Sequence, residues 1–372
     1  MYNETQAGKT YLRGISAIYL LLGPACNMSC RHCTQIPIKN TLSLRPECGL
    51  SNRVIQFIQK WLAARGKYSS RIYFWGGEPL LYWESIKRYI LLFESQGIFP
   101  RQYMIFSNGL LLTKEIADFC NRHRVMFTMS YDAPDPLAVR NAVPTQENVE
   151  AFLTCEKRCV NFVFNALNCD PVRAFAMLEE KFPETYITMG FINIISDIPK
   201  DIYTFRDVQI ERALDMLADD IVAGHDPYGN RYNFFIAKFS SYDTFQADRF
   251  RKRPFPPCAP GAISLSIRFN GDIVLCHNDN TVVANVEDSY MNIQRNHLRE
   301  WKKRILKKCF SCPVLPICRN RCPIAMLKGG GTEYDHCEIL RRFYGSAMRN
   351  REKLTESEIK EYLDLQLLTR TG

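Results

Sequence analysis

The sequence predicts an α/β protein with a parallel sheet covered by helices, followed by a small cysteine-rich region. Over residues 15–194, apolar runs of strand length alternate with segments whose apolar residues recur at helical spacing. Such alternation is typical of a parallel sheet, either open or curled into a partial barrel. After residue 250, cysteines recur between short polar and proline-containing spacers, which indicates a region stabilised by metal centres.

Length and composition limit the class of protein. The 372 residues suit two or more domains, and a hydrophobic content of 46% is ordinary for a globular chain. Without a membrane-length apolar stretch or a secretory segment, we expect a cytoplasmic protein. In a reducing compartment, the 15 cysteines indicate metal or cluster ligation rather than disulfides. The net charge of +9 is compatible with an acidic partner, but surface solvation is the simpler interpretation. We expect neither a nucleic-acid nor a membrane partner.

The expected elements begin with a strand in the apolar run 15–22, which Gly23-Pro24 ends. Apolar residues from Val54 to Leu62 recur at helical spacing, with Gly66 as a stop. The following elements are strand 72–75, helix 84–96, strand 102–106, helix 114–123, strand 125–130, helix 146–158, strand 161–166, helix 172–182 and strand 186–194. Together they make about six β/α units, whose binding sites lie at the carboxyl ends of the strands.

The rest of the chain is less regular. Residues 195–250 form a bridge with an expected helix at 207–222, and Asn270-Gly271 marks a hairpin within 263–276. Cys155 and Cys159 are expected on one helix face. We interpret these two cysteines as packing residues, together with Cys48, Cys120 and Cys169.

Three cysteines, Cys26, Cys30 and Cys33, stand in the loop directly after the first strand. Thiolates favour iron–sulfur clusters, zinc or copper(I). A [4Fe–4S] cluster needs four ligands, so three local cysteines would leave one iron open to a substrate or cofactor. Zinc sites normally show paired Cys-x2-Cys units, and a disulfide knot is disfavoured in a long chain without a secretory signal. A lipoprotein signal would give two of the three cysteines no role. The loop therefore predicts an iron–sulfur cluster.

Glycines and polar residues follow the next three strands. Gly76-Gly77-Glu78-Pro79 comes directly after the second strand. The glycines permit close backbone approach, and Glu78 offers a carboxylate to an ammonium group. Ser107-Asn108-Gly109 follows the third strand, Ser130-Tyr131-Asp132 the fourth, and Arg140 lies a little beyond. Alone, these are ordinary turn residues and a surface charge, but their register after the cysteine loop favours a shared site.

The cysteine loop resembles the signature of the radical S-adenosylmethionine (SAM) enzymes. In that family the open iron chelates SAM, and an electron from the cluster releases a 5′-deoxyadenosyl radical that abstracts hydrogen. The resemblance implies that Cys26, Cys30 and Cys33 are the catalytic cluster ligands, with His32 at the place of an aromatic residue near the adenine. It also implies SAM contacts from the residues after the later strands, namely Gly76, Gly77, Glu78, Ser107, Asn108, Ser130 and Arg140, with Arg140 as partner of the carboxylate.

The last third resembles the SPASM domain of radical SAM enzymes that modify peptides and proteins. Gly271-x4-Cys276 and the cysteines from 309 to 337 carry this resemblance. It implies two auxiliary [4Fe–4S] clusters, the outer held by Cys309, Cys312, Cys318 and Cys337 and the inner by Cys258, Cys276 and Cys322. The inner cluster lacks a fourth ligand in this assignment, because Ala259-Pro260-Gly261 supplies none. Zinc would explain one set of four cysteines, but seven is awkward for two zinc ions.

These resemblances imply a partial (β/α)6 radical SAM barrel over residues 1–200, a bridging region over 201–250, a SPASM domain of α+β type over 251–345 and a helical tail over 346–372. The expected activity is hydrogen abstraction from a ribosomally made peptide to install a cross-link or another oxidative change. Flavodoxin or ferredoxin would supply electrons. Residues 1–14 are too few for a recognition domain, so the catalytic body or a separate protein is expected to bind any leader.

Two alternatives remain open. One is an enzyme like the anaerobic sulfatase maturases, which oxidise serine or cysteine to formylglycine on a whole protein. The other is a non-catalytic cluster carrier or zinc-binding adaptor, against which the glutamate motif after the second strand argues.

Overall fold

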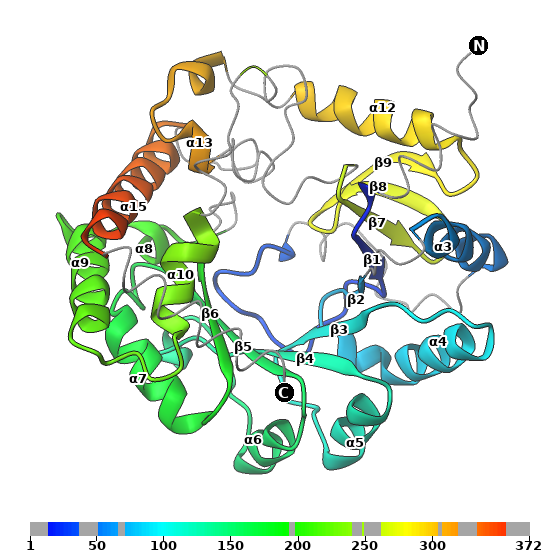
Figure 1. Ribbon diagram of the computed structural model, residues 1–372, viewed down its shortest axis with the longest axis horizontal. Coiled ribbons are helices and arrows are strands. Elements are labelled where there is room, and N and C mark those ends of the chain that lie inside the picture. Colours follow the sequence, from blue (N-terminus) through cyan, green and yellow to red (C-terminus); the bar gives the residue numbers. More distant parts are fainter. Residues whose placement is uncertain are drawn as a thin grey trace.

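The computed structural model describes residues 14–36, 51–65, 71–192, 198–239, 248, 262–303, 307–318 and 333–354. These residues contain one nine-stranded sheet in the order β6-β5-β4-β3-β2-β1-β7-β8-β9. The sheet curves around a central space, and helices cover its outer side (Figure 1). The α/β fold with a parallel, barrel-like sheet is therefore confirmed.

The barrel strands follow the predicted alternation. They are β1 (Ala17–Leu21), β2 (Arg71–Trp75), β3 (Gln102–Ser107), β4 (Val125–Ser130), β5 (Arg158–Phe164) and β6 (Tyr186–Phe191), each parallel to the next. Side chains alternate between the two faces of a strand. In β1, Ile18 and Leu20 are buried in the main core, whereas Tyr19 packs in a separate cluster and stacks on Tyr73 of β2. The concave face is thus also lined with side chains.

The outer helices are α3 (Asn52–Arg65), α4 (Trp83–Ser95), α5 (Lys114–Arg122), α6 (Gln146–Leu153) and α7 (Pro171–Lys181). Side-chain caps explain three of the helix starts, because Thr113, Thr145 and Asp170 each accept a backbone N–H of the first turn. Two short 3₁₀ turns, η1 (Pro79–Tyr82) and η2 (Pro136–Ala138), follow β2 and β4. Both lie at the strand ends where the site was predicted.

One predicted helix is too long. We expected a helix over 146–158, but α6 ends at Leu153 and β5 begins at Arg158. Cys155 therefore lies in the connection and Cys159 in the strand, so the prediction that they share a helix face is wrong. Residues from Arg158 onward pair with both β4 and β6, and this tertiary pairing outweighs the local helical spacing.

The expected packing role fits most of these cysteines. Cys120, Cys155 and Cys159 are buried and Cys169 is half-buried, while Cys48 lies outside the described residues.

The predicted hairpin joins the barrel sheet directly. It consists of β7 (Ser264–Arg268) and β8 (Asp272–Cys276), followed by β9 (Asp279–Asn285). Gly271 has φ +96 in the turn, a conformation that glycine adopts without strain. Strand β7 pairs in parallel with β1, with Ala17 opposite Ser264. Strand β1 therefore has a partner on each side, and the sheet is continuous from the barrel into the hairpin.

The remaining helices are α8 (Lys200–Tyr203), α9 (Gln209–Val222), α10 (Asn230–Phe239), α12 (Tyr290–Lys302), α13 (Leu315–Cys318) and α15 (Glu333–Lys353), with the 3₁₀ turn η3 (Lys307–Ser311). Helix α9 confirms the expected helix of the bridge. Helix α15 is packed on α9, where Arg342 contacts Glu211 through two hydrogen bonds of 2.8 Å. None of the helices in the described ranges is long and apolar enough to cross a membrane.

Candidate active site

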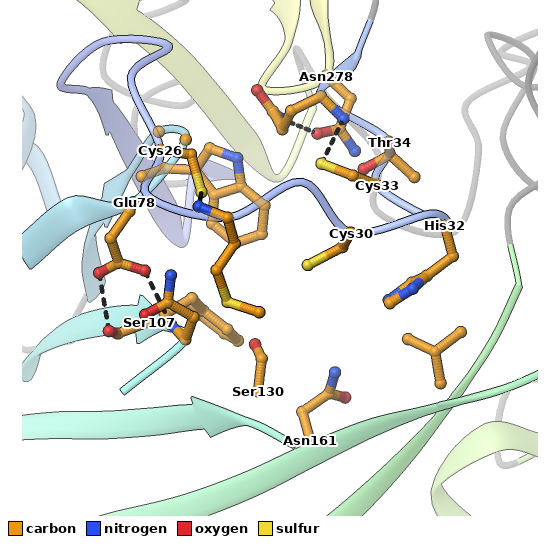
Figure 2. Close-up of a pocket in the computed structure, with 18 of the residues that line it drawn as sticks. Cys26, Cys30, His32, Cys33, Thr34, Glu78, Ser107, Ser130, Asn161 and Asn278 are labelled. Carbon is orange, nitrogen blue, oxygen red and sulfur yellow. Dashed lines mark hydrogen bonds between the residues drawn. The ribbon is translucent and has the colours of Figure 1, made fainter. Parts of the chain in front are cut away.

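A cavity of about 350 Å³ opens at the carboxyl ends of the barrel strands. In Figure 2, Cys26, Cys30 and Cys33 project from one loop, while Ser130 and Asn161 face them from the strands opposite. All predicted site residues of the barrel line this cavity, namely Cys26, Cys30, His32, Cys33, Gly76, Gly77, Glu78, Ser107, Asn108, Ser130 and Arg140. The structure thus brings together residues that are up to 114 positions apart (140 − 26) in the sequence.

Backbone contacts hold the cysteine loop against the segment after β2. Gly77 N donates to Gly23 O at 2.9 Å and Glu78 N to Ala25 O at 2.8 Å. A Cβ on Gly77 would stand 2.3 Å from Ala25 O, and one on Gly76 would stand 2.5 Å from Gly23 O. The two glycines are therefore required by the close approach of two backbones.

The three thiols of the loop suit ligation of a cluster. They are half-buried, and the described part of the chain shows no disulfide at any of them. Met28 N donates to Cys26 Sγ and Gln35 N to Cys33 Sγ, both at 3.4 Å, and Arg140 Nη1 lies 4.0 Å from Cys30 Sγ. These donors stabilise negative charge on sulfur. Burial raises the pKa of Cys30 to about 11, although Arg140 opposes the shift. A coordinated metal reverses this, because it deprotonates a ligating thiol.

The spacing of the three thiols distinguishes a site for a single metal ion from a site for an iron–sulfur cluster. Among the residues that the structure describes, no three Cys, His, Asp or Glu side chains converge as ligands of a single metal ion would. A [4Fe–4S] cluster makes a different demand, because each cysteine binds a different iron. The donor set of soft thiols, N–H donors and a nearby cation fits such a cluster.

Glu78 is almost fully buried, at 1% exposure. Its Oε1 accepts Leu80 N at 2.9 Å and Ser107 Oγ at 2.8 Å, and its Oε2 accepts Asn108 N at 2.8 Å. Burial raises the pKa of Glu78, while these hydrogen bonds oppose the rise. A carboxylate has about four acceptor positions, so one remains for a ligand. Ser107 and Asn108 therefore hold Glu78 in place as well as lining the cavity.

Asp132 is the main residue whose role the sequence reasoning missed. It belongs to the Ser130-Tyr131-Asp132 motif, yet no function was predicted for it. Its Oδ2 lies 2.6 Å from Arg140 Nε and 3.2 Å from His32 Nε2. Burial alone would raise the pKa of Asp132, but Arg140, His32 and the hydrogen bond from Val163 N together lower it. The motif was visible in the sequence, whereas these partners became apparent only in the fold.

Trp75 and His277, which were not predicted as site residues, form another part of the cavity wall. His277 stacks on Tyr19 with ring centroids 4.5 Å apart and meets the Trp75 ring at 4.5 Å. Burial lowers the pKa of His277 to about 4, so its imidazole is neutral at physiological pH. Apart from its place next to Cys276, no sequence pattern marks His277 as a site residue.

Gln35 links the cysteine loop to the hairpin. Its Nε2 donates to His277 O at 3.1 Å and also to Asn278 Oδ1. Asn278 N in turn donates to Cys276 Sγ at 3.3 Å. Cys276 is therefore tied to the loop that carries Cys33, although the two cysteines are far apart in sequence.

A second group of cysteines gathers away from this cavity. A narrow pocket of about 30 Å³ is lined by Cys309, Cys312, Cys318 and Cys337, together with Val314, Leu315 and Leu340. These four cysteines are the set predicted for the outer cluster. Cys258 and Cys322, two of the three predicted inner ligands, lie outside the described residues.

A curved parallel sheet with three thiols and paired charges at its carboxyl end defines an α/β protein built to bind a cluster and a small cofactor. Residues 20–165 match the sequence model of the Radical SAM superfamily. This part of the chain is therefore similar to the radical SAM domain, and such a domain implies a [4Fe–4S] cluster and SAM. The chain is 24% identical over 340 residues to the radical SAM cyclopropyl synthase TigE of Paramaledivibacter caminithermalis. The aligned region covers 85% of this chain and 70% of TigE.

Solved structures share the fold. Native anSMEcpe with bound AdoMet and Cp18Cys peptide has a TM-score of 0.64 at 14% identity, covering 90% of this chain and 98% of that chain. Streptococcus suis SuiB bound to precursor peptide SuiA has a TM-score of 0.58 at 16% identity, covering 89% and 76%. The likeness extends beyond the matched domain to nearly the whole chain.

Proposed function

We propose that this protein is a radical SAM enzyme that abstracts hydrogen from a ribosomally made peptide and installs a cross-link or another oxidative modification. The observation that carries the proposal is the cavity at the strand ends, where three thiols, a buried carboxylate and a buried guanidinium line one space. When bound, the reduced cluster and SAM supply a 5′-deoxyadenosyl radical that abstracts hydrogen from carbon.

The charges of the cavity complement the amino-acid end of SAM. Glu78 has one acceptor position left for an ammonium group. Arg140 offers a cation to a carboxylate, and it lines the same cavity. We assign the cluster to Cys26, Cys30 and Cys33, which line the same cavity as these two charges. His32 would lie near the adenine, and Ser107, Asn108 and Ser130 near the ribose.

The proposal includes two auxiliary clusters in a SPASM domain. The four cysteines of the narrow pocket support an outer cluster, since they come from segments as distant as η3 and α15 yet line one space. The inner cluster would be held by Cys258, Cys276 and Cys322. The inner cluster would have an open iron for a substrate group, and the auxiliary clusters would accept the second electron.

Peptide as the substrate class rests on the relatives. Two of the solved structures that share the fold contain peptides, the SuiB complex with SuiA and the anSMEcpe complex with Cp18Cys. A cytoplasmic location and a reductant such as flavodoxin or ferredoxin complete the proposal.

The test is SAM cleavage followed by peptide modification. Anaerobically reconstituted protein with a reductant should release 5′-deoxyadenosine. A short peptide encoded by a neighbouring gene should then lose mass in steps of two hydrogens, which mass spectrometry detects. Failure to form 5′-deoxyadenosine would remove the proposed activity.

The fold that the chain shares with anSMEcpe over 90% of its length supports a second candidate, oxidation of a serine or cysteine to formylglycine. A sulfatase-motif peptide discriminates the two, because only the second candidate would convert it to an aldehyde. A non-catalytic carrier would bind iron yet form no 5′-deoxyadenosine with either peptide.

A further inference from the structure

One carboxylate behind the cavity contacts two of its lining residues at once. Asp132 is fully buried, at 0% exposure, and does not belong to the residues that line the cavity. Its Oδ2 lies 2.6 Å from Arg140 Nε and 3.2 Å from His32 Nε2. Both of these partners do line the cavity. Asp132 therefore stands one layer behind the surface that a ligand would touch.

The contact with Arg140 constrains the direction of its guanidinium. The group is planar, with its five N–H donors in a rigid fork. Arg140 Nε donates to Asp132 Oδ2, while Nη1 of the same rigid fork lies 4.0 Å from Cys30 Sγ. Arg140 is itself only 9% exposed, so a buried cation faces the cysteine loop with its orientation fixed from behind.

The contact with His32 constrains a second residue of the cysteine loop. His32 lies between Cys30 and Cys33 in the loop, and its side chain is 9% exposed. The loop is also held to the same segment by Arg31 N, which donates to Val139 O at 2.9 Å. The residues from Asp132 to Arg140 thus hold the loop through its backbone and through one ring.

We propose that Asp132 is the positioning residue of this site, which orients Arg140 toward the carboxylate of SAM and fixes the His32 ring without touching SAM itself. The inference rests on the proposed function, because it takes Arg140 as a ligand of SAM. In metal sites, partners one layer behind the ligating groups typically change metal affinity or activity by about 10- to 100-fold when removed, and we expect an effect of that order on SAM affinity here.

A purely structural role is the competing explanation. Asp132 Oδ1 also accepts Val163 N at 2.8 Å and so ties the end of β4 to β5. Asp132→Asn separates the two roles, because asparagine keeps an oxygen for Val163 but removes the charge beside Arg140. A matched control is Glu179→Gln, which removes a carboxylate 2.9 Å from the buried Arg231, in a pair that does not line the cavity.

The experiment is a double-mutant cycle on SAM affinity, measured by equilibrium dialysis of the reconstituted protein. Its variants are Asp132→Asn, Arg140→Ala and the two combined. Each single change should weaken SAM binding by about 10-fold or more, and the double variant should bind no worse than Arg140→Ala, because residues that act as one unit are not additive. Glu179→Gln should lower the melting temperature and leave SAM affinity unchanged.

Three outcomes would overturn the positioning role. They are unchanged SAM affinity in Asp132→Asn, additive losses in the double variant, or an equal loss of affinity in the Glu179→Gln control. If Asp132→Asn does not retain its iron, Arg140→Lys decides instead, since it keeps the charge and loses the Nε contact. Undiminished affinity in Arg140→Lys would also overturn the proposal. If the unaltered protein itself binds no SAM, the proposed function fails, and this inference with it.

Discussion

The two cysteine groups of this chain occupy different kinds of space. The cavity at the strand ends has a volume of about 350 Å³. Beside its thiols it is lined by the carboxylate of Glu78, the guanidinium of Arg140 and aromatic rings. The pocket of Cys309, Cys312, Cys318 and Cys337 has about 30 Å³ and is otherwise lined by Val314, Leu315 and Leu340. One group of thiols therefore lies in a large cavity with charged side chains, and the other lies in a narrow pocket with apolar ones.

A cysteine pattern alone therefore does not identify a catalytic site. Solvent access and the groups beyond the first ligands control the chemistry of a metal site. The cavity has room and charges for a second molecule, whereas the narrow pocket has room only for what its four thiols hold. We therefore expect substrate chemistry at the first group and a structural or electron-transfer role at the second.

The largest effect should come from the first group. Changing Cys26, Cys30 and Cys33 together to alanine should abolish 5′-deoxyadenosine formation, because no thiol would remain there to hold the cluster. The variant should keep the iron of the C-terminal region, which iron analysis measures. Undiminished cleavage of SAM in this variant would show that these three thiols do not hold the cluster that cleaves SAM.

The second group should show a large effect on iron content. If three [4Fe–4S] clusters are present, the intact protein should hold about twelve irons, and Cys309→Ala with Cys312→Ala should lose about four of them. SAM binding should persist, since neither cysteine lines the cavity. A protein with about four irons and bound zinc would instead identify a structural zinc module.

An intermediate effect is expected at Glu78. Glu78→Gln removes a charge from the one acceptor position left for the SAM ammonium and replaces one oxygen by a donor that faces Ser107 or Asn108. SAM affinity should fall by about 1.5–3 kcal/mol, the range for hydrogen bonds to charged groups, with the iron content retained. Isothermal titration calorimetry measures this, and an unchanged affinity would limit Glu78 to holding the turn.

The smallest effect concerns helix α15, which carries Cys337. Hydrogen bonds from Arg342 lower the pKa of Glu211 below its ordinary value of 4.5. The pair therefore stabilises the fold above about that pH, and the contribution is lost as pH falls through the lowered pKa. Glu211→Gln should reduce the free energy of unfolding by about 0.2–1 kcal/mol at neutral pH. Urea unfolding should show this difference disappear in acid, and a difference that persists there would have another cause.

Local features of the fold and site were predictable. The cysteine loop, the Gly76-Gly77-Glu78 turn and the Asn270-Gly271 hairpin are short patterns whose residue types set their own geometry. The cavity could be anticipated because carboxyl ends of parallel strands meet at one edge. The register of these motifs after successive strands was enough to group the residues.

Contacts between distant segments were not predictable. The pairing of Asp132 with His32, and of Gln35 with Asn278, depends on side-chain directions that the full fold determines. The end of α6 at Leu153 was missed because strand pairing outweighs helical spacing. The pairing of β7 with β1 was missed because no local signal specifies which strand of a barrel a later hairpin will join.

That pairing has a consequence for how the chain can be divided. Strand β1 lies between β2 and β7, so a fragment ending before residue 262 would leave one side of β1 as an open edge. Unpaired edges of apolar strands are templates for aggregation. Strand β7 of the hairpin thus covers the edge of β1. A barrel fragment without it would be a poor expression target. Such a fragment would also be unsuitable for grafting onto another C-terminal region.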